Sequence, residues 1–251
     1  MQVGFIGAGN MARALARGWG EPVLCTDSGS GRAQALADEL GGEALASNRD
    51  LAERADLVIL AHKPAQLADI AREAAGAKAV VSLLARTKLA DVRAAYPGVP
   101  AFRVMPNTPV ELGRGAIAFA EPEPDAGLAE DLRLEVRDRF ARVGTVVDVP
   151  EKLMGIAGAC SGVGPAYWAL LVEAQVDAAV RRGLPAALAS TLVVETMAGS
   201  AELLRAREGD TFGVRREVTS PGGTTAQGLA ALERGGVRAA FASAMDDVVG
   251  V

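Results

Sequence analysis

The stretch Val3–Leu15, VGFIGAGNMARAL, leaves an apolar run, places two glycines close together and continues directly into a helical pattern. Gly7, Gly9 and Ala12 fit the G-x-G-x-x-G/A pattern: a glycine for the turn, one for close approach to a pyrophosphate, and a small residue for helix packing. A glycine-rich turn without a ligand is the plainer interpretation. Its place after a predicted strand and before a helix with free N–H groups favours dinucleotide binding.

Dinucleotide-binding domains place an acidic residue on the ribose 2′-hydroxyl about 20 positions after this pattern. Asp27, in LCTDSGSGR at the end of the second predicted strand, stands at this place and favours NADH. Ser28, Ser30 and Arg32 follow directly and could hold the 2′-phosphate of NADPH, with Asp27 as a turn residue. The sequence leaves the choice between the two cofactors open.

Short apolar runs alternate with helical patterns as far as Val149. Such runs are typical of parallel strands buried on both faces. We therefore predict an α/β domain over residues 1–149, a Rossmann-type doubly wound sheet, in which antiparallel pairing of the last strands stays open. The predicted strands are VGFIG, PVLCT, LVILA, AVVSLL, AFRVM, GAIAFA and TVVDV.

Residues 150–251 contain no strand-like run and predict an all-α domain. The helices are apolar around much of their circumference, so we expect a partner subunit to cover them. The predicted helical segments are 151–159, 161–182, 185–207, 210–217, 224–234 and 236–249.

Composition excludes several classes of function for this chain of 251 residues, which is 50% hydrophobic and 23% charged. A net charge of -5 without a basic block argues against a nucleic-acid partner. Cys25 and Cys160 form no C-x-x-C motif and His62 is the single histidine, so we expect no metal site and a reducing, cytoplasmic setting. We expect no signal peptide, and the apolar segment Gly164–Val180 carries two acidic residues, so we expect no membrane span.

Three further stretches suit ligand binding. Val218–Gly228, VTSPGGTTAQG, is a polar glycine-rich turn before a helix, where backbone N–H groups and hydroxyls could hold a carboxylate. An N-capped turn without a ligand is the alternative. Met105–Pro109, MPNTP, and Ala61–Gln66, AHKPAQ, follow predicted strands at the sheet edge where ligands of such folds bind.

Together with Ser161–Tyr167, SGVGPAY, these stretches resemble the pyrroline-5-carboxylate reductases, from Val3 to about Val248. The resemblance is carried by MPNTP, S-G-x-G-P-A-Y and VTSPGGTT, which occur in this order along the chain and are more specific than the glycine pattern. It implies a Rossmann domain followed by a helical dimerisation domain. It also implies reduction of 1-pyrroline-5-carboxylate to L-proline with NADPH or NADH. The family's helical domains interlock in a homodimer, and its dimers commonly assemble further into rings.

The resemblance also implies site residues. The pyrophosphate would lie against Ile6, Gly7, Ala8, Gly9, Asn10 and Met11. The adenosine half would lie against Asp27 or Ser28 and Asn48, and the nicotinamide half would lie against His62, Lys63, Pro64 and Ala85, largely through backbone. Apart from the resemblance, Arg32 is the candidate ligand of a 2′-phosphate and Asn107 is a further candidate cofactor contact. The substrate would contact Glu151, Ser220, Gly222, Gly223, Thr224 and Thr225, and Thr225 would be the catalytic hydroxyl beside the imine.

The sequence departs from the family pattern at several positions. His62 replaces the valine of A-V-K-P, and Leu84-Ala85-Arg86 replaces a small A-A-G turn and brings a bulky cation toward the nicotinamide. Val163 stands where serine is usual, and Glu217 stands where a neutral residue is common. The last helix is several turns shorter than the family's.

Three other functions stay open. A reductase of a related cyclic imine fits the same architecture and would accommodate the departures. A hydroxyacid dehydrogenase of this architecture would need a base such as lysine, but the lysines, Lys63, Lys78, Lys88 and Lys152, all lie outside the helix Gly164–Val180 where it would stand. A nucleotide-sensing regulator would bind the cofactor without catalysis. It would need no turn that holds a carboxylate, so the VTSPGGTT turn argues against it.

Overall fold

The computed structural model describes residues 1–121 and 130–250. The chain divides into two compact units, Met1–Pro165 and Ala166–Val251, and each is described by itself. The domain boundary between residues 149 and 150 stays a prediction.

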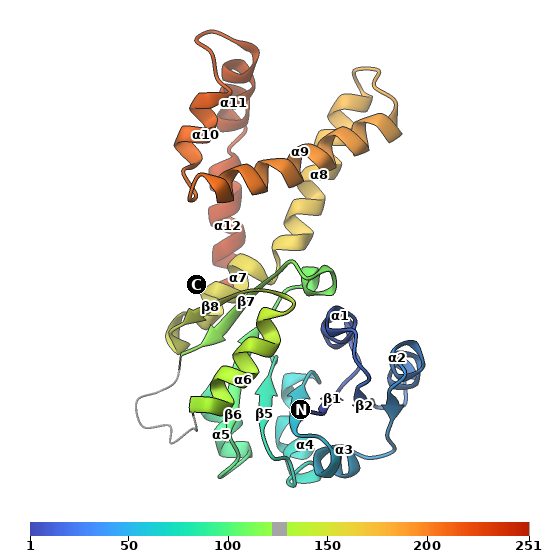
Figure 1. Ribbon diagram of the computed structural model, residues 1–251. Helices are drawn as coiled ribbons and strands as arrows, with labels where there is room; N and C mark the ends of the chain where they lie inside the picture. Colours follow the sequence, from blue (N-terminus) through green and yellow to red (C-terminus); the bar gives the residue numbers. More distant parts are fainter. Residues whose placement is uncertain (122–129, 251) are drawn as a thin grey trace. The chain divides into compact units, whose positions relative to one another are not determined.

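A mostly parallel sheet forms the centre of the first unit (Figure 1). Its strands are β1 (Val3–Ile6), β2 (Leu24–Thr26), β3 (Glu43–Ala44), β4 (Leu57–Leu60), β5 (Val80–Ser82), β6 (Ala101–Met105), β7 (Gly115–Ala120) and β8 (Gly144–Val149). Within the described residues the eight strands run in the order β3-β2-β1-β4-β5-β6-β7-β8. Neighbours are parallel except β6 and β7. The Rossmann-type doubly wound fold is confirmed, and antiparallel pairing occurs at one place among the last strands.

Helices cover both faces of this sheet. They are α1 (Asn10–Trp19), α2 (Arg32–Leu40), α3 (Asn48–Arg54), α4 (Leu67–Glu73), α5 (Leu89–Ala95) and α6 (Glu130–Ala141), with 3-10 turns η1 (Pro64–Gln66), η2 (Thr108–Leu112) and η3 (Glu151–Leu153). One core contains residues of α1, α2 and α6, and the other contains residues of α3, α4 and α5. Phe5 and Ile6 enter opposite cores because successive strand side chains alternate. Burial on both faces explains the continuous apolar run of β1.

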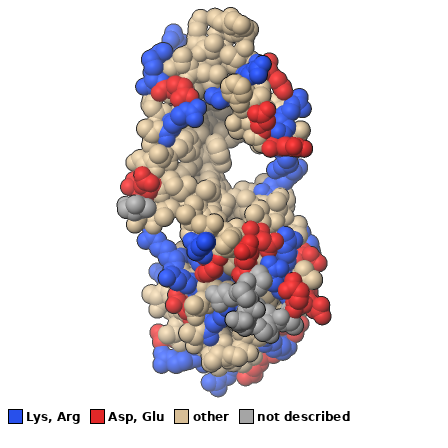
Figure 2. Space-filling model, turned by 90° about the vertical axis from the view of Figure 1, so that its left-hand side faces the viewer, with Lys and Arg blue, Asp and Glu red and all other residues tan. Residues whose placement is uncertain are grey.

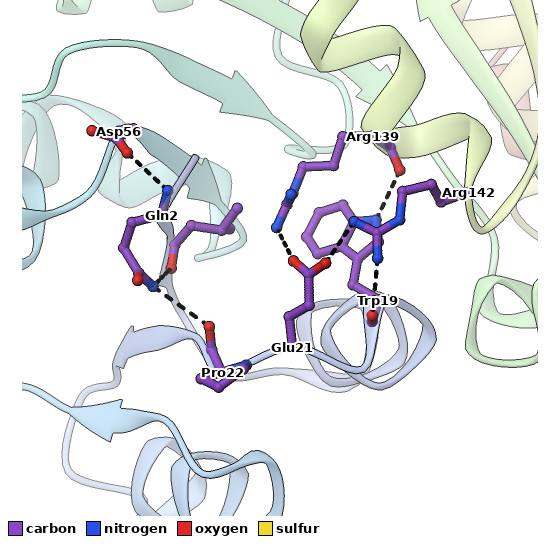
Figure 3. Close-up of polar contacts among 8 residues, drawn as sticks. Gln2, Trp19, Glu21, Pro22, Asp56, Arg139 and Arg142 are labelled. Atoms are coloured by element: carbon purple, nitrogen blue, oxygen red, sulfur yellow. Dashed lines mark hydrogen bonds and ion pairs between the residues drawn. The ribbon is translucent and has the colours of Figure 1, made fainter.

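The C-terminal end of α1 is anchored to α6 (Figure 3). The Trp19 ring packs edge-on against Phe140 at 5.4 Å between centroids, and its Nε1 donates to the Arg139 carbonyl oxygen at 3.0 Å. Glu21 accepts from Arg139 and from Arg142, each at 2.7 Å. These guanidinium groups hold the pKa of Glu21 below its usual range, with the Arg142 hydrogen bond as the larger cause.

Helices make up the rest of the described chain, as predicted. They are α7 (Met154–Ser161), α8 (Gly164–Val180), α9 (Ala186–Ala206), α10 (Thr211–Glu217), α11 (Thr224–Arg234) and α12 (Val237–Val249). Met154 of α7 is buried against Ala118 and Ala120 of β7, within the first unit. The helical C-terminal part of the predicted fold is therefore confirmed.

Large apolar side chains remain exposed on the helices of the second unit. Leu188 and Leu192 of α9 are 57% and 59% exposed, and uncharged residues cover much of this unit's surface in Figure 2. Two stretches, Glu151–Val180 and Ala186–Ala206, are long and apolar enough to cross a membrane by length and composition alone. Each is mostly unburied within the single chain, so these faces need a cover that one copy does not provide.

Candidate functional site

The three positions of the glycine pattern after β1 differ in how much space they leave for a side chain. Gly7 has φ +100, and a Cβ atom there would lie 2.7 Å from the Ala61 carbonyl oxygen, so a side chain is excluded. Gly9 is the N-cap residue of α1, and a Cβ atom there would meet nothing within 4 Å, so its backbone faces open space. Ala12 is buried against the sheet. The turn therefore offers the approach to helix N–H groups that a pyrophosphate requires.

A pocket of about 1060 Å³ opens at this turn, along the carboxyl ends of β1, β2 and β4. Ten of the predicted cofactor residues line it: Ile6, Gly7, Ala8, Gly9, Asp27, Ser28, Arg32, Asn48, His62 and Lys63. Asn10, Met11, Pro64, Ala85 and Asn107 are not among its lining residues. The lining also includes residues that sequence reasoning did not name as cofactor ligands, among them Thr26, Arg49, Gln66, Ile70 and Glu73.

The Asp27 carboxylate is bound to its own loop. One oxygen accepts from the Gly29 amide at 2.8 Å, and the other accepts from the Ser30 hydroxyl at 2.7 Å and the Ala33 amide at 3.0 Å. The Ala33 amide is the largest cause that lowers the pKa of Asp27 to about 2, with smaller effects from Ser30 and Gly29. Both carboxylate oxygens therefore already serve the turn that begins α2.

Asn48, at the start of α3, also has structural partners at the pocket wall. The Thr26 hydroxyl donates to Asn48 Oδ1 at 2.6 Å, and Asn48 Nδ2 donates to Glu73 Oε2 at 2.6 Å. This chain of hydrogen bonds joins β2, α3 and α4. The predicted contact of Asn48 with the adenosine half stays a prediction, but its amide is oriented by protein groups.

His62 is half-buried beside the glycine turn. Its Nδ1 lies 2.9 Å from the Lys63 carbonyl oxygen, and its Nε2 is buried without a hydrogen-bond partner among the described residues. Burial lowers the pKa of His62, so the ring is neutral at neutral pH and Nδ1 carries the proton that faces the carbonyl. The ring therefore lines the pocket as an uncharged group.

The polar turn before α11 lies in the second unit. Gly222 has φ +69, in the left-handed region that favours glycine. Gly223 is the N-cap residue of α11, and its amide donates to the Ser220 carbonyl oxygen at 3.1 Å. The first amides of the eleven-residue helix, at Thr224 and Thr225, follow directly. The free N–H groups of a helix start suit an anion. Carboxylate binding at this turn stays a prediction.

Comparisons with known proteins cover both units. The family model for pyrroline-5-carboxylate reductase dimerisation matches residues 151–250, and a model for coenzyme F420-dependent NADP oxidoreductases matches residues 2–86. The pyrroline-5-carboxylate reductase of Synechocystis is 35% identical over 98% of this chain and 94% of its own length. The chain belongs to the pyrroline-5-carboxylate reductase family. The Streptococcus pyogenes enzyme structure is 30% identical with a TM-score of 0.91, covering 100% of this chain and 97% of its own. The Plasmodium falciparum pyrroline carboxylate reductase structure, with NADP bound, is 26% identical with a TM-score of 0.89, covering 100% and 96%.

The structure shows the surroundings of two residues that depart from the pyrroline-5-carboxylate reductase pattern, Arg86 and Glu217. Arg86 has φ +58, which explains why glycine suits this position in the family's A-A-G turn. Glu217 forms an ion pair with Arg207 at 3.0 Å, so its charge is compensated near the polar turn. The Arg207 cation offsets part of the repulsion that a carboxylate at Glu217 would exert on an anionic ligand.

Two predicted site residues have partners inside the first unit. Glu151 Oε1 accepts from Arg103 at 2.6 Å and from the Leu89 amide at 2.9 Å. Asn107 Nδ2 donates to the Ser161 carbonyl oxygen at 3.2 Å, and its Oδ1 accepts from the Ala116 amide at 2.8 Å. These side chains tie α7 and η3 to the sheet, and their contacts with substrate or cofactor stay predictions.

Arg103 was missed by sequence reasoning, although a charged residue inside the apolar run AFRVM is a signal of a buried ion pair. Its side chain is only 5% exposed and that of Glu151 is 21% exposed. Removing one partner of such a pair leaves the other charge buried without compensation.

We therefore expect Glu151→Gln to lower the free energy of unfolding by about 3 kcal/mol, because the Arg103 charge loses its partner. The double variant Glu151→Leu/Arg103→Met should recover most of this loss, since no buried charge remains. Urea unfolding followed by circular dichroism measures both. A double variant that is no more stable than Glu151→Gln would contradict this account.

Proposed function

We propose that this chain reduces 1-pyrroline-5-carboxylate to L-proline, with NADPH as the reductant. The observation that carries the proposal is the nearly full-length likeness to curated pyrroline-5-carboxylate reductases. The two candidate sites also support the proposal, because each is suited to bind one of the two reactants. The glycine turn and its pocket suit a dinucleotide, and the start of α11 suits a small carboxylate.

In the proposed reaction the bound cofactor would supply a hydride to C5 of the imine. A protonated cyclic imine is already electrophilic, so the protein mainly has to hold and orient the two rings. The substrate carboxylate would lie at the N–H groups of the turn, formed by Ser220, Gly222, Gly223, Thr224 and Thr225. The Thr225 hydroxyl would hydrogen-bond the ring nitrogen, and no strong base is required.

Loss of NADPH absorbance on addition of pyrroline-5-carboxylate tests the proposal. A cyclic imine without a carboxylate, and a hydroxyacid with NADP⁺ in the oxidative direction, are the comparisons. Preference for the plain imine would favour the related imine reductase, and turnover of the hydroxyacid alone would favour the dehydrogenase. Cofactor binding without any turnover would favour the nucleotide sensor.

We expect Thr225→Ala to lower kcat about 100-fold, because the ring nitrogen would lose its hydrogen-bond partner. Cofactor affinity should stay nearly unchanged, since Thr225 is assigned to the substrate. Thr225→Ser keeps the hydroxyl and should retain most of the activity. Steady-state kinetics with pyrroline-5-carboxylate measures all three proteins, and equal turnover in the alanine variant would dismiss this role.

Preference for NADPH over NADH is supported by the bonds of Asp27. Both carboxylate oxygens of Asp27 accept hydrogen bonds within the turn before α2, so Asp27 has a structural role that does not require it to bind a ribose. Arg32 and Arg49, both exposed, line the same pocket with Ser28 and bring positive charge to this end. A 2′-phosphate pairs well with guanidinium groups.

Arg32→Ala should therefore raise the KM for NADPH tenfold or more, at about 1.4 kcal/mol per factor of ten, and change the KM for NADH little. Lys78→Ala, which removes an exposed cation outside the pocket lining, is the matched control. Equal effects of Arg32→Ala on both cofactors would contradict the assignment.

A second copy of the chain is the proposed cover for the apolar helices of the second unit. The dimerisation family model matches the segment that carries Leu188 and Leu192, which lie on one side of α9 because they are four residues apart. Assembly of dimers into rings, a cytoplasmic location and the absence of nucleic-acid and membrane partners stay predictions.

We expect Leu192→Asp to dissociate the dimer, because the interface would bury an unpaired carboxylate. Sedimentation velocity should give one chain mass, 25.7 kDa, for the variant at concentrations where the parent sediments as twice that mass. Leu112→Asp is the matched control, because Leu112 is 81% exposed in the first unit. A parent that sediments as a single chain would overturn the dimer.

A further inference from the structure

The far wall of the cofactor pocket is formed by α4, which the glycine pattern does not involve. Ile70 and Glu73 of α4 line the pocket together with Asn48 of α3. Ile70 is buried in the core below α4, whereas Glu73 is exposed. This wall therefore combines an apolar side chain with a carboxylate three residues later on the same side of the helix.

The orientation of Glu73 is determined by the hydrogen bonds behind it. A carboxylate only accepts hydrogen bonds, so Asn48 must present its Nδ2 to Glu73, which it does at 2.6 Å. The Asn48 oxygen then needs a donor, and the buried Thr26 hydroxyl supplies one at 2.6 Å. Asn48 engages Oε2, and in the described part of the chain Glu73 has no other hydrogen-bond partner. Oε1 is thus available to a ligand in the pocket.

The order of the pocket residues indicates what this ligand group is. A dinucleotide with its pyrophosphate at Gly7 and Gly9 and its ribose at the Asp27 loop must place its base farther along the pocket wall. A flat aromatic base matches an apolar side chain such as Ile70. The exocyclic amino group of adenine is a donor, and a carboxylate oxygen is its complement.

We propose that Glu73 recognises the adenine of the cofactor by accepting a hydrogen bond from its exocyclic amino group. This inference rests on the proposed dinucleotide binding. Hypoxanthine carries a carbonyl oxygen in place of that amino group, so it would bring two acceptors together. A site that hydrogen-bonds one group discriminates strongly against an analogue that lacks it.

Titration of the full chain with NADPH and with deamino-NADPH, which carries hypoxanthine, tests the inference without any substrate. We expect the parent to bind deamino-NADPH about tenfold more weakly, equivalent to about 1.4 kcal/mol. In Glu73→Gln the side-chain oxygen can still accept from Asn48, which turns the amide nitrogen toward the ligand. This variant should lose the preference or prefer hypoxanthine. Glu53→Gln, at an exposed carboxylate of α3 outside the pocket lining, should keep the parent's ratio.

Equal binding of the two cofactors by the parent would overturn the inference, as would an unchanged ratio in Glu73→Gln. A parent that discriminates between them but does not reduce pyrroline-5-carboxylate would overturn the proposed reaction and leave the assignment of Glu73 supported. Failure to bind either cofactor would overturn both.

Discussion

The close approach of the Gly7 backbone to the end of β4 is the constraint on which the cofactor half of this protein depends. A side chain at Gly7 would collide with the Ala61 carbonyl oxygen, so the turn after β1 can pass directly over the neighbouring strand only as glycine. That path places the start of α1 at the carboxyl edge of the sheet. The contacts of Trp19 and Glu21 with α6 hold the other end of the helix.

Around this turn, side chains that look like ligands in the sequence are partly engaged in building the pocket. Asp27 closes the loop before α2, and Asn48 connects β2 to α4. Both leave other groups facing the pocket, namely the arginines near Asp27 and Glu73 beyond Asn48. Asp27 and Asn48 thus have structural partners of their own beside the groups that line the pocket with them.

The two units place different demands on the chain. The sheet of the first unit is buried by its own helices on both faces, so this unit contains its own core. The second unit leaves leucines of α9 exposed in the described part of the chain. The proposed carboxylate turn lies in this second unit, so substrate binding and dimer formation would depend on the same unit of the chain.

Much of the fold was predictable, because local patterns carry it. Continuous apolar runs such as VGFIG identified strands buried on both faces, and Gly7, Gly9 and Ala12 identified the turn from spacing alone. The strand β3 was missed because Glu43 and Ala44 form no apolar run. The direction of β7 could not be read either, because parallel and antiparallel strands share the same apolar pattern.

The sequence by itself determined the fold class, the glycine turn and the family, because these depend on residues that are close together or on motifs in a specific order. Only the tertiary structure decided which polar side chains are free to meet a ligand. Glu151 accepts a hydrogen bond from the Leu89 amide, 62 residues away in the sequence, and Asn48 donates one to Glu73, 25 residues away. Hydrogen-bond partners that distant are brought together by packing, and no local pattern encodes them.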